Sequence, residues 1–186
     1  MIYDGLLLID LDGTLVDSLE ITSTSYLYAL EDIGVRLEKE VLLRELFGLS
    51  FSDFCDTLMI PYPSRANLRS RKNHYFSQMH SQIPYREEVL NEINSNEFSN
   101  HFKCLATHAS LATVSLYVRS LFLRIGEYAI LTSDNYKYRK SQTDYFKTVT
   151  KLFGYSLSQI TLIDDNLLNI QTAKRLGCDV RYFPIR

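Results

Sequence analysis

The chain has 186 residues, of which 46% are hydrophobic and 23% are charged, and its formal net charge is −2. This length allows one good hydrophobic core, or a core domain with a modest insertion. The small negative charge argues against a general nucleic-acid binder, which usually carries a basic surface.

Other sequence features restrict the compartment and the cofactor chemistry. The three cysteines are scattered and form no C-x-x-C pair, so neither a disulfide framework nor a zinc site is predicted. No apolar run approaches the length of a membrane span. The first residues have no basic region and only a short apolar run, unlike a signal peptide. We therefore expect a cytoplasmic protein.

The first predicted element is a short buried strand over residues 6–9, which ends in two acids. Asp10 follows the strand directly, Asp12 comes two residues later, and Gly13 with Thr14 predicts a tight polar turn. Carboxylates at the end of a buried strand are costly unless a cation or a reaction needs them. The alternative is an ordinary polar turn after a strand.

The next part of the chain, residues 19–81, shows helical spacing and no convincing strand. Asp17 or Ser18 can cap the first helix, which stops at Gly34. The helices are expected at residues 17–33, 38–47, 51–60 and 64–80, with Pro61 and Pro63 breaking the chain before the last one.

From residue 84 onward, helices alternate with apolar strands. This alternation predicts a parallel sheet covered on both faces by helices. Because the apolar runs end in polar or acidic residues, we expect those ends to share one edge of the sheet. The predicted strands are residues 102–106, 128–131, 160–163 and 180–183, and the predicted helices are 84–94, 111–123, 145–153 and 167–176.

A second acidic signal follows the strand at residues 160–163, where Asp164 and Asp165 are adjacent. Two neighbouring carboxylates repel each other, and a hard cation between them and Asp10 would remove the repulsion. Magnesium prefers carboxylate and carbonyl oxygens as ligands. The alternative is a solvated acidic turn that caps the next helix.

These acidic segments carry a family resemblance. Residues 10–18 resemble motif I of the haloacid dehalogenase superfamily, D-x-D-G-T followed by L-x-D-S, and every position is filled. Residues 160–177 resemble motif IV in its two-acid form, although Asn169 stands where many relatives have Asp. The resemblance implies that Asp10, Asp165 and the main-chain carbonyl of Asp12 bind Mg²⁺, with Asp164 as a further ligand or as the holder of a bound water.

Two weaker motifs lie between them. Residues 140–154 resemble motif III, with Lys140 in the lysine position and Ser-Gln-Thr replacing the usual Pro-Asp-Pro, so a less rigid loop is expected. Lys137 and Arg139 are alternatives to Lys140. Thr107 fits motif II, which binds a phosphate oxygen, and His108 stands where relatives often have Asn.

The resemblance implies an α/β fold, namely a Rossmann-like parallel sheet with helices on both faces and a small all-α cap inserted after the first strand. The expected domains are a core of residues 1–16 and 82–186 and a helical cap of residues 17–81. A cap of this kind closes over the site and reads the leaving group.

The implied activity is a magnesium-dependent phosphatase acting on a small phosphorylated metabolite. Asp10 would be the nucleophile, Asp12 the general acid and base, and Lys140, Thr107 and His108 would hold the phosphate. Dehalogenases of the superfamily lack an acid at the position of Asp12, so a phosphatase is favoured over a dehalogenase. A phosphomutase and a non-catalytic binding or regulatory protein remain the alternatives. We expect no nucleic-acid or membrane partner and a monomer or weak dimer.

Overall fold

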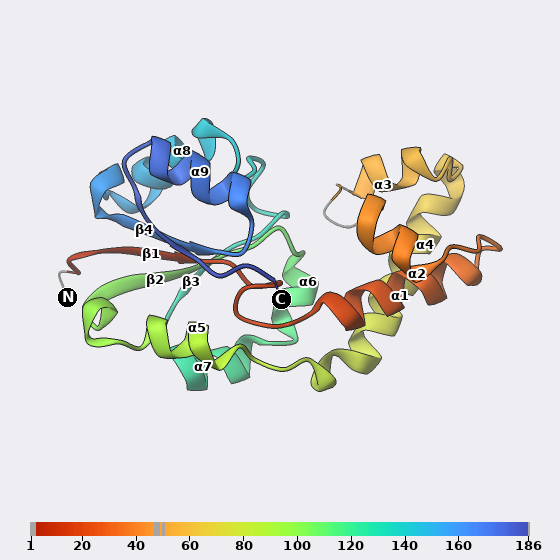
Figure 1. The fold of residues 1–186 in the computed structure, drawn as a ribbon, viewed down its shortest axis with the longest axis horizontal. Coiled ribbons are helices and arrows are strands. Elements are labelled where there is room, and N and C mark those ends of the chain that lie inside the picture. Colours follow the sequence, from red (N-terminus) through yellow and green to blue (C-terminus); the bar gives the residue numbers. More distant parts are fainter. Residues whose placement is uncertain (1–2, 47–48, 50, 186) are drawn as a thin grey trace. The chain divides into compact units, whose positions relative to one another are not determined.

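A computed structural model of the chain describes residues 3–46, 49 and 51–185. Figure 1 shows its elements in chain order. The chain divides into two compact units, of which one is Met1–Asp17 with Pro84–Arg186 and the other is Ser18–Ile83. The first unit is an α/β structure and the second is built from helices. Within the described residues, no helix is both long and apolar enough to cross a membrane.

The α/β unit is organised around a five-stranded sheet with the order β3-β2-β1-β4-β5 in the described part of the chain. All neighbouring strands are parallel. The strands are β1 (Gly5–Ile9), β2 (His101–Ala106), β3 (Ala129–Leu131), β4 (Ile160–Asp164) and β5 (Asp179–Tyr182).

The central strands are buried on both faces, which explains their uninterrupted apolar sequences. Every residue of β1 is buried, because β2 and β4 pair with it on either side and helices cover both faces. Leu8 lies opposite Cys104 on β2 and Leu162 on β4. All three belong to one hydrophobic cluster, together with Phe146 and Val149.

Helices cover the sheet from two sides. Figure 1 shows α8 and α9 on one face and α5 and α7 on the other. The two α8 residues of the cluster, Phe146 and Val149, have no exposed surface. The helices of this unit are α5 (Glu87–Ile93), α6 (Leu111–Ser115), α7 (Val118–Ile125), α8 (Thr143–Phe153) and α9 (Leu167–Arg175).

The helical unit has a separate core. Leu30, Phe54 and Leu68 come from three different helices and are buried in one cluster. Its helices are α1 (Leu19–Glu31), α2 (Lys39–Val41), α3 (Phe51–Thr57) and α4 (Tyr62–Met79), with a π-helical turn at Leu42–Leu46 after α2. The unit is inserted after β1, so the predicted fold class is confirmed.

Several predicted helix bounds were wrong. Proline in a first turn lacks only an N–H that has no partner in the helix, so Pro63 lies inside α4 instead of breaking the chain before it. The predicted 84–94 helix begins only at Glu87, because Pro84–Arg86 is used for contacts with the β1 loop.

Two further helix predictions differ from the structure. The predicted helix 111–123 is two helices, separated between Ser115 and Val118. The predicted helix 38–47 is α2 followed by a π-helical turn, and its last residue, Phe47, lies outside the described residues.

Candidate active site

The order of the strands reverses between β1 and β4, and this topological switch point brings the acids together. Strands β2 and β3 lie on one side of β1, and β4 and β5 lie on the other. Ligands of open parallel sheets bind beyond the carboxyl ends of the strands at such a point. Asp10 follows β1 there, and its backbone N–H donates to the Ile163 carbonyl of β4 at 3.0 Å. Asp164 and Asp165 lie at the end of β4.

Lys140 joins the two strand ends. Its Nζ lies 2.5 Å from Asp10 Oδ1 and 2.7 Å from Asp164 Oδ2, and it donates to the Ala106 carbonyl at 2.8 Å. An ammonium has three N–H donors, so these contacts use all of them. The Lys140 side chain is 1% exposed, so the ion pairs are shielded from water. Lys140 therefore offsets part of the negative charge of the two carboxylates, and groups of the protein occupy its three donors.

The charges at this site do not balance. Asp10, Asp164 and Asp165 offer carboxylate oxygens that all lie within 4.8 Å of one another. Three carboxylates and one ammonium leave a net charge of −2. Burial raises the pKa of Asp10 well above its ordinary value, and Asp164 and Asp165 raise it further, while Lys140 opposes the shift. The pKa of Asp165 is also raised, mainly by burial.

The carboxylate of Asp164 accepts hydrogen bonds from several groups. The backbone N–H of Asn166 donates to Oδ1 at 2.8 Å, and the amide of Asn169 lies 3.1 Å from Oδ1 and 3.2 Å from Oδ2. Together with Lys140, these donors occupy both oxygens of a side chain that has no exposed surface. Asp164 is thereby committed to holding Lys140.

Asp165 is oriented by the turn that follows β1. Thr14 Oγ1 donates to Asp165 Oδ1 at 2.9 Å, whereas its distance to Asp10 Oδ2 is 3.4 Å. A hydroxyl has one hydrogen, and the shorter distance favours Asp165 as the acceptor. Asp165 and Asp10 therefore retain oxygens that a cation could share.

Asp12 is half-buried in the same turn, next to a tyrosine of the α/β unit. Burial raises the pKa of the Tyr117 phenol, and the negative charge of Asp12 raises it further. This proximity brings Tyr117, which the sequence analysis did not single out, close to the second acid of the motif.

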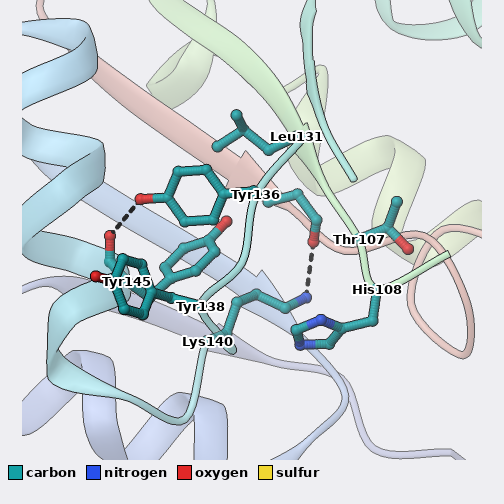
Figure 2. Close-up of a pocket in the computed structure, with 8 residues that line it drawn as sticks. Thr107, His108, Leu131, Tyr136, Tyr138, Lys140 and Tyr145 are labelled. Atoms are coloured by element: carbon teal, nitrogen blue, oxygen red, sulfur yellow. Dashed lines mark hydrogen bonds between the residues drawn. The ribbon is translucent and has the colours of Figure 1, made fainter. Parts of the chain in front are cut away.

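Thr107 and His108 lie at the end of β2, beside Lys140 in Figure 2. The Thr107 N–H donates to the Leu131 carbonyl at 2.9 Å, and its hydroxyl oxygen accepts from the Ala109 N–H at 3.0 Å. These bonds fix the loop. A small cavity of about 10 Å³ is lined by Ala106, Thr107, His108, Leu131, Tyr136, Tyr138, Lys140 and Tyr145.

The segment before α8 presents Lys140 and leaves its two basic neighbours, Lys137 and Arg139, at the surface. The loop is braced without the proline pattern of motif III. Gln142 accepts from the Arg139 N–H at 3.0 Å through its side chain and donates its own N–H to the Arg139 carbonyl at 2.8 Å. These two hydrogen bonds restrict the loop in place of the proline residues of motif III.

The donor set suits a divalent hard cation. Its ligand atoms are carboxylate oxygens, which Mg²⁺ prefers, and the net charge of −2 matches the charge of the ion. Such an ion would relieve the like-charge repulsion that Asp164 and Asp165 add to the effect of burial on the pKa of Asp10.

The structure thus brings Asp10, Asp164, Asp165 and Lys140 into direct or near contact, and it places Thr107 and His108 on the same edge of the sheet. Sequence reasoning missed the roles of Thr14, Asn166 and Asn169 in holding these side chains. The signal for two of them was present, since Asn166 follows the paired acids directly and Asn169 comes three residues later.

Comparisons with known proteins agree with this arrangement. The family of haloacid dehalogenase-like hydrolases matches residues 7–182. No match was found among curated proteins. Similar solved structures include a hydrolase from Pseudomonas syringae, with 22% identity, a TM-score of 0.76, and coverage of 95% of this chain and 82% of that one.

Two other similar structures were determined with ligands. A variant of CbbY from Rhodobacter sphaeroides in complex with xylulose-1,5-bisphosphate has 17% identity and a TM-score of 0.80, with coverage of 98% of this chain and 87% of that chain. YfnB from Bacillus subtilis, described as a HAD-hydrolase and bound to magnesium, has 17% identity and a TM-score of 0.70, with coverage of 97% and 89%.

The fold and the buried carboxylate cluster are those of an α/β enzyme, with a candidate site at the carboxyl ends of a parallel sheet. The chain belongs to the haloacid dehalogenase-like hydrolase family, which its match over nearly the whole length shows.

Proposed function

We propose that this protein is a Mg²⁺-dependent phosphatase that hydrolyses a small phosphorylated metabolite through an aspartyl-phosphate on Asp10. The observation that carries the proposal is the contact of Lys140 with both Asp10 and Asp164, beside a third carboxylate, at the switch point of the sheet. Lys140 favours the charged form of both carboxylates, but Asp164 also accepts hydrogen bonds from Asn166 and Asn169, which leaves Asp10 as the proposed nucleophile.

Asp10 attacks phosphorus with one carboxylate oxygen, and the bond from phosphorus to the leaving oxygen breaks. Asp12 donates its proton to that oxygen, so the alcohol leaves in neutral form. A water molecule then attacks the phosphorus of the aspartyl-phosphate and gives a proton to Asp12. The acyl-phosphate P–O bond breaks, which restores Asp10 and releases phosphate.

Asp10 and Asp165 are the side chains proposed to hold the metal, joined by the main-chain carbonyl of Asp12 as the family resemblance implies. A bound Mg²⁺ supplies charge neutralisation between the carboxylate and the phosphoryl oxygens. Asp164 is assigned to Lys140 instead of the metal, because three hydrogen bonds and one ion pair occupy its two carboxylate oxygens.

Lys140 opposes the rise in the pKa of Asp10 and holds its carboxylate in place, and its charge favours the approach of an anionic phosphoryl group. The Thr107 hydroxyl can donate to a phosphate oxygen while its own oxygen accepts from Ala109. His108, beside Lys140, is the second proposed phosphate contact.

The substrate class and the domain roles are proposed from the relatives. The CbbY variant was determined with a phosphorylated sugar and YfnB with magnesium, and both have a similar fold. We propose that the α/β unit is the core domain and that the helical unit, residues 18–83, is the cap domain.

Hydrolysis of p-nitrophenyl phosphate with and without Mg²⁺ tests the proposal. We expect turnover that requires the metal and that falls at least 1,000-fold in Asp10→Asn, on the order of the loss when a catalytic nucleophile is removed. Asp12→Asn should fall as well, most strongly on alkyl phosphates, whose poor leaving groups need a proton. The control Asp144→Asn changes an exposed acid on α8 and should leave the turnover unchanged.

Equal turnover with and without Mg²⁺, or activity that survives in Asp10→Asn, would contradict the mechanism. Lack of hydrolysis by the wild-type chain on both this compound and a set of sugar phosphates would favour the non-catalytic alternative.

A further inference from the structure

Arg86 makes an unusual set of contacts just before α5. Its Nη1 donates to the Gly13 carbonyl at 2.5 Å and to the Phe183 carbonyl at 3.1 Å. Its Nη2 donates to the Pro184 carbonyl at 3.2 Å and to Glu88 Oε1 at 3.0 Å, and its Nε donates to the same Glu88 oxygen at 3.1 Å. A guanidinium has five N–H donors, and these five contacts use all of them.

The backbone fixes where this guanidinium lies. The Arg86 N–H donates to the Leu15 carbonyl at 2.9 Å, and the Asp17 N–H donates to the Pro84 carbonyl at 3.0 Å. The segment before α5 is therefore paired with the chain that leaves the Asp12–Gly13 turn. The Arg86 side chain is 11% exposed, so its hydrogen bonds are largely shielded from solvent.

Gly13, whose carbonyl Arg86 binds, lies in a crowded position between the acidic site and the segment after β5. A Cβ placed on Gly13 would lie 2.6 Å from Asp165 Oδ2 and 3.0 Å from the Ile185 Cδ1 methyl. Its φ of +79° also favours glycine. A small displacement of the Asp12–Gly13 turn would therefore change its distance from the carboxylate of Asp165.

We propose that Arg86 is a positioning residue, which, together with the carbonyls of Phe183 and Pro184, clamps the Asp12–Gly13 turn against Asp165. The inference rests on the proposed function, since the clamp matters for the acid Asp12 and the metal-binding acid Asp165. Arg86 acts through the Gly13 carbonyl and touches no reacting group.

The chemistry of the clamp requires arginine. Three carbonyl oxygens and one carboxylate oxygen accept from the rigid, planar guanidinium, whereas a lysine is a flexible point charge with three donors. Outer partners that orient a metal site typically change metal affinity or activity 10- to 100-fold when they are removed.

The test compares Arg86→Met with Arg181→Met. Arg181 is a matched control because it is also partly buried and its ion-pair partners, Glu92, Glu97 and Asp179, all lie outside the turn. We expect Arg86→Met to lower kcat and the Mg²⁺ affinity measured by titration calorimetry about 10-fold or more. Arg181→Met should lower the melting temperature and leave both values unchanged.

Arg86→Lys tests whether the planar guanidinium is needed. This variant should recover less than half of the Mg²⁺ affinity that Arg86→Met loses. Removal of the chain after Tyr182 deletes both carbonyls on the far side of the clamp. Because Arg86 and that segment act as one unit, the double variant should lose little more Mg²⁺ affinity than the worse single variant.

The outcomes separate this inference from the proposed function. Metal-dependent turnover in the wild type, with Arg86→Met and Arg181→Met giving the same kcat and Mg²⁺ affinity, would overturn the clamp alone. Additive losses in the double variant would also overturn it. A wild-type chain without Mg²⁺ binding and without turnover would overturn the proposed function, and the clamp with it.

Discussion

Lys140 and the two carboxylates that it contacts form a buried ionic group that the fold must stabilise. Lys140 and Asp164 have almost no exposed surface, and Asp10 has little. Burial alone would lower the pKa of Lys140, but Asp10 and Asp164 raise it above its ordinary value. The lysine therefore remains charged across the physiological range, and its removal would leave two buried carboxylates without a cation.

We expect Lys140→Met to lower the free energy of unfolding by about 3–5 kcal/mol, the range for loss of one member of a buried ion pair. Adding Asp164→Asn should restore part of this loss, because one of the uncompensated charges is removed. Urea unfolding measures both changes. Lys147→Met is the control, since its exposed pair with Asp144 should contribute about 1 kcal/mol or less.

His108 gives a pH prediction. Partial burial of the imidazole, and then the positive charges of Lys140 and Arg139, lower the pKa of His108 to about 4, although the residue as a whole is exposed. The ordinary histidine value is about 6.5, so the unfolded chain binds more protons between these two values. The free energy of unfolding should consequently decrease as the pH falls from 6.5 to 4.

His108→Asn removes the titrating group and should weaken this pH dependence. Unfolding of both proteins at pH 7.5 and pH 5 provides the comparison, and the variant should lose less stability at the lower pH. The same change in both proteins would show that His108 titrates with an ordinary pKa.

At the scale of elements, two glycines with nearly the same φ have different surroundings. Gly154 ends α8 with φ +77°, and a Cβ there would meet no atom within 4 Å. Gly13 has φ +79°, but a Cβ there would lie 2.6 Å from Asp165 Oδ2. The pair separates the cost of backbone conformation from the cost of crowding.

Gly154→Ala should lower the free energy of unfolding by about 1–2 kcal/mol, the cost of a left-handed conformation for a residue with a Cβ, and leave turnover unchanged. Gly13→Ala should add a loss of Mg²⁺ affinity and of phosphatase turnover, because the new methyl group displaces Asp165. Thermal unfolding and titration calorimetry measure these effects. Normal Mg²⁺ affinity in Gly13→Ala would contradict the crowding.

The helix bounds show what local patterns omit. The apolar residues 111–123 have helical spacing, but the chain forms α6 and α7 with a break after Ser115. The start of α6 follows a local signal, since Ser110 accepts from the Thr113 N–H at 3.2 Å, as an N-cap residue should. The two glutamates in the first turn of α5 are a weak local signal for its start, but the contacts that keep Arg86 outside the helix are with residues far away in the chain.

At the scale of the whole molecule, the cluster of acids links stability to the metal. Mg²⁺ that binds the folded state alone stabilises it by about 2.7 kcal/mol at a concentration 100 times the dissociation constant. For a chain of this size, about 1 kcal/mol corresponds to about 2–4 °C in melting temperature. We therefore expect Mg²⁺ to raise the melting temperature by about 5–10 °C.

Asp165→Asn should abolish most of this increase, since it removes a proposed ligand. It should also raise the melting temperature of the metal-free protein, because a buried like charge is lost. Differential scanning fluorimetry across Mg²⁺ concentrations measures both effects. An undiminished Mg²⁺ response in Asp165→Asn would assign the metal to other residues.

The sequence by itself determined the five strands of the described sheet, the helical insertion and the acids of the site. Buried parallel strands are short apolar runs, and acids at their ends are visible without a structure. The structure decided which basic residue belongs to the site, because Lys140 is buried against Asp10 whereas Lys137 and Arg139 are exposed. It also decided that Asp164 holds Lys140 and that Arg86 binds Gly13. These contacts join residues 24 and 73 positions apart, and such pairings depend on how strands and loops meet in space, which local sequence does not encode.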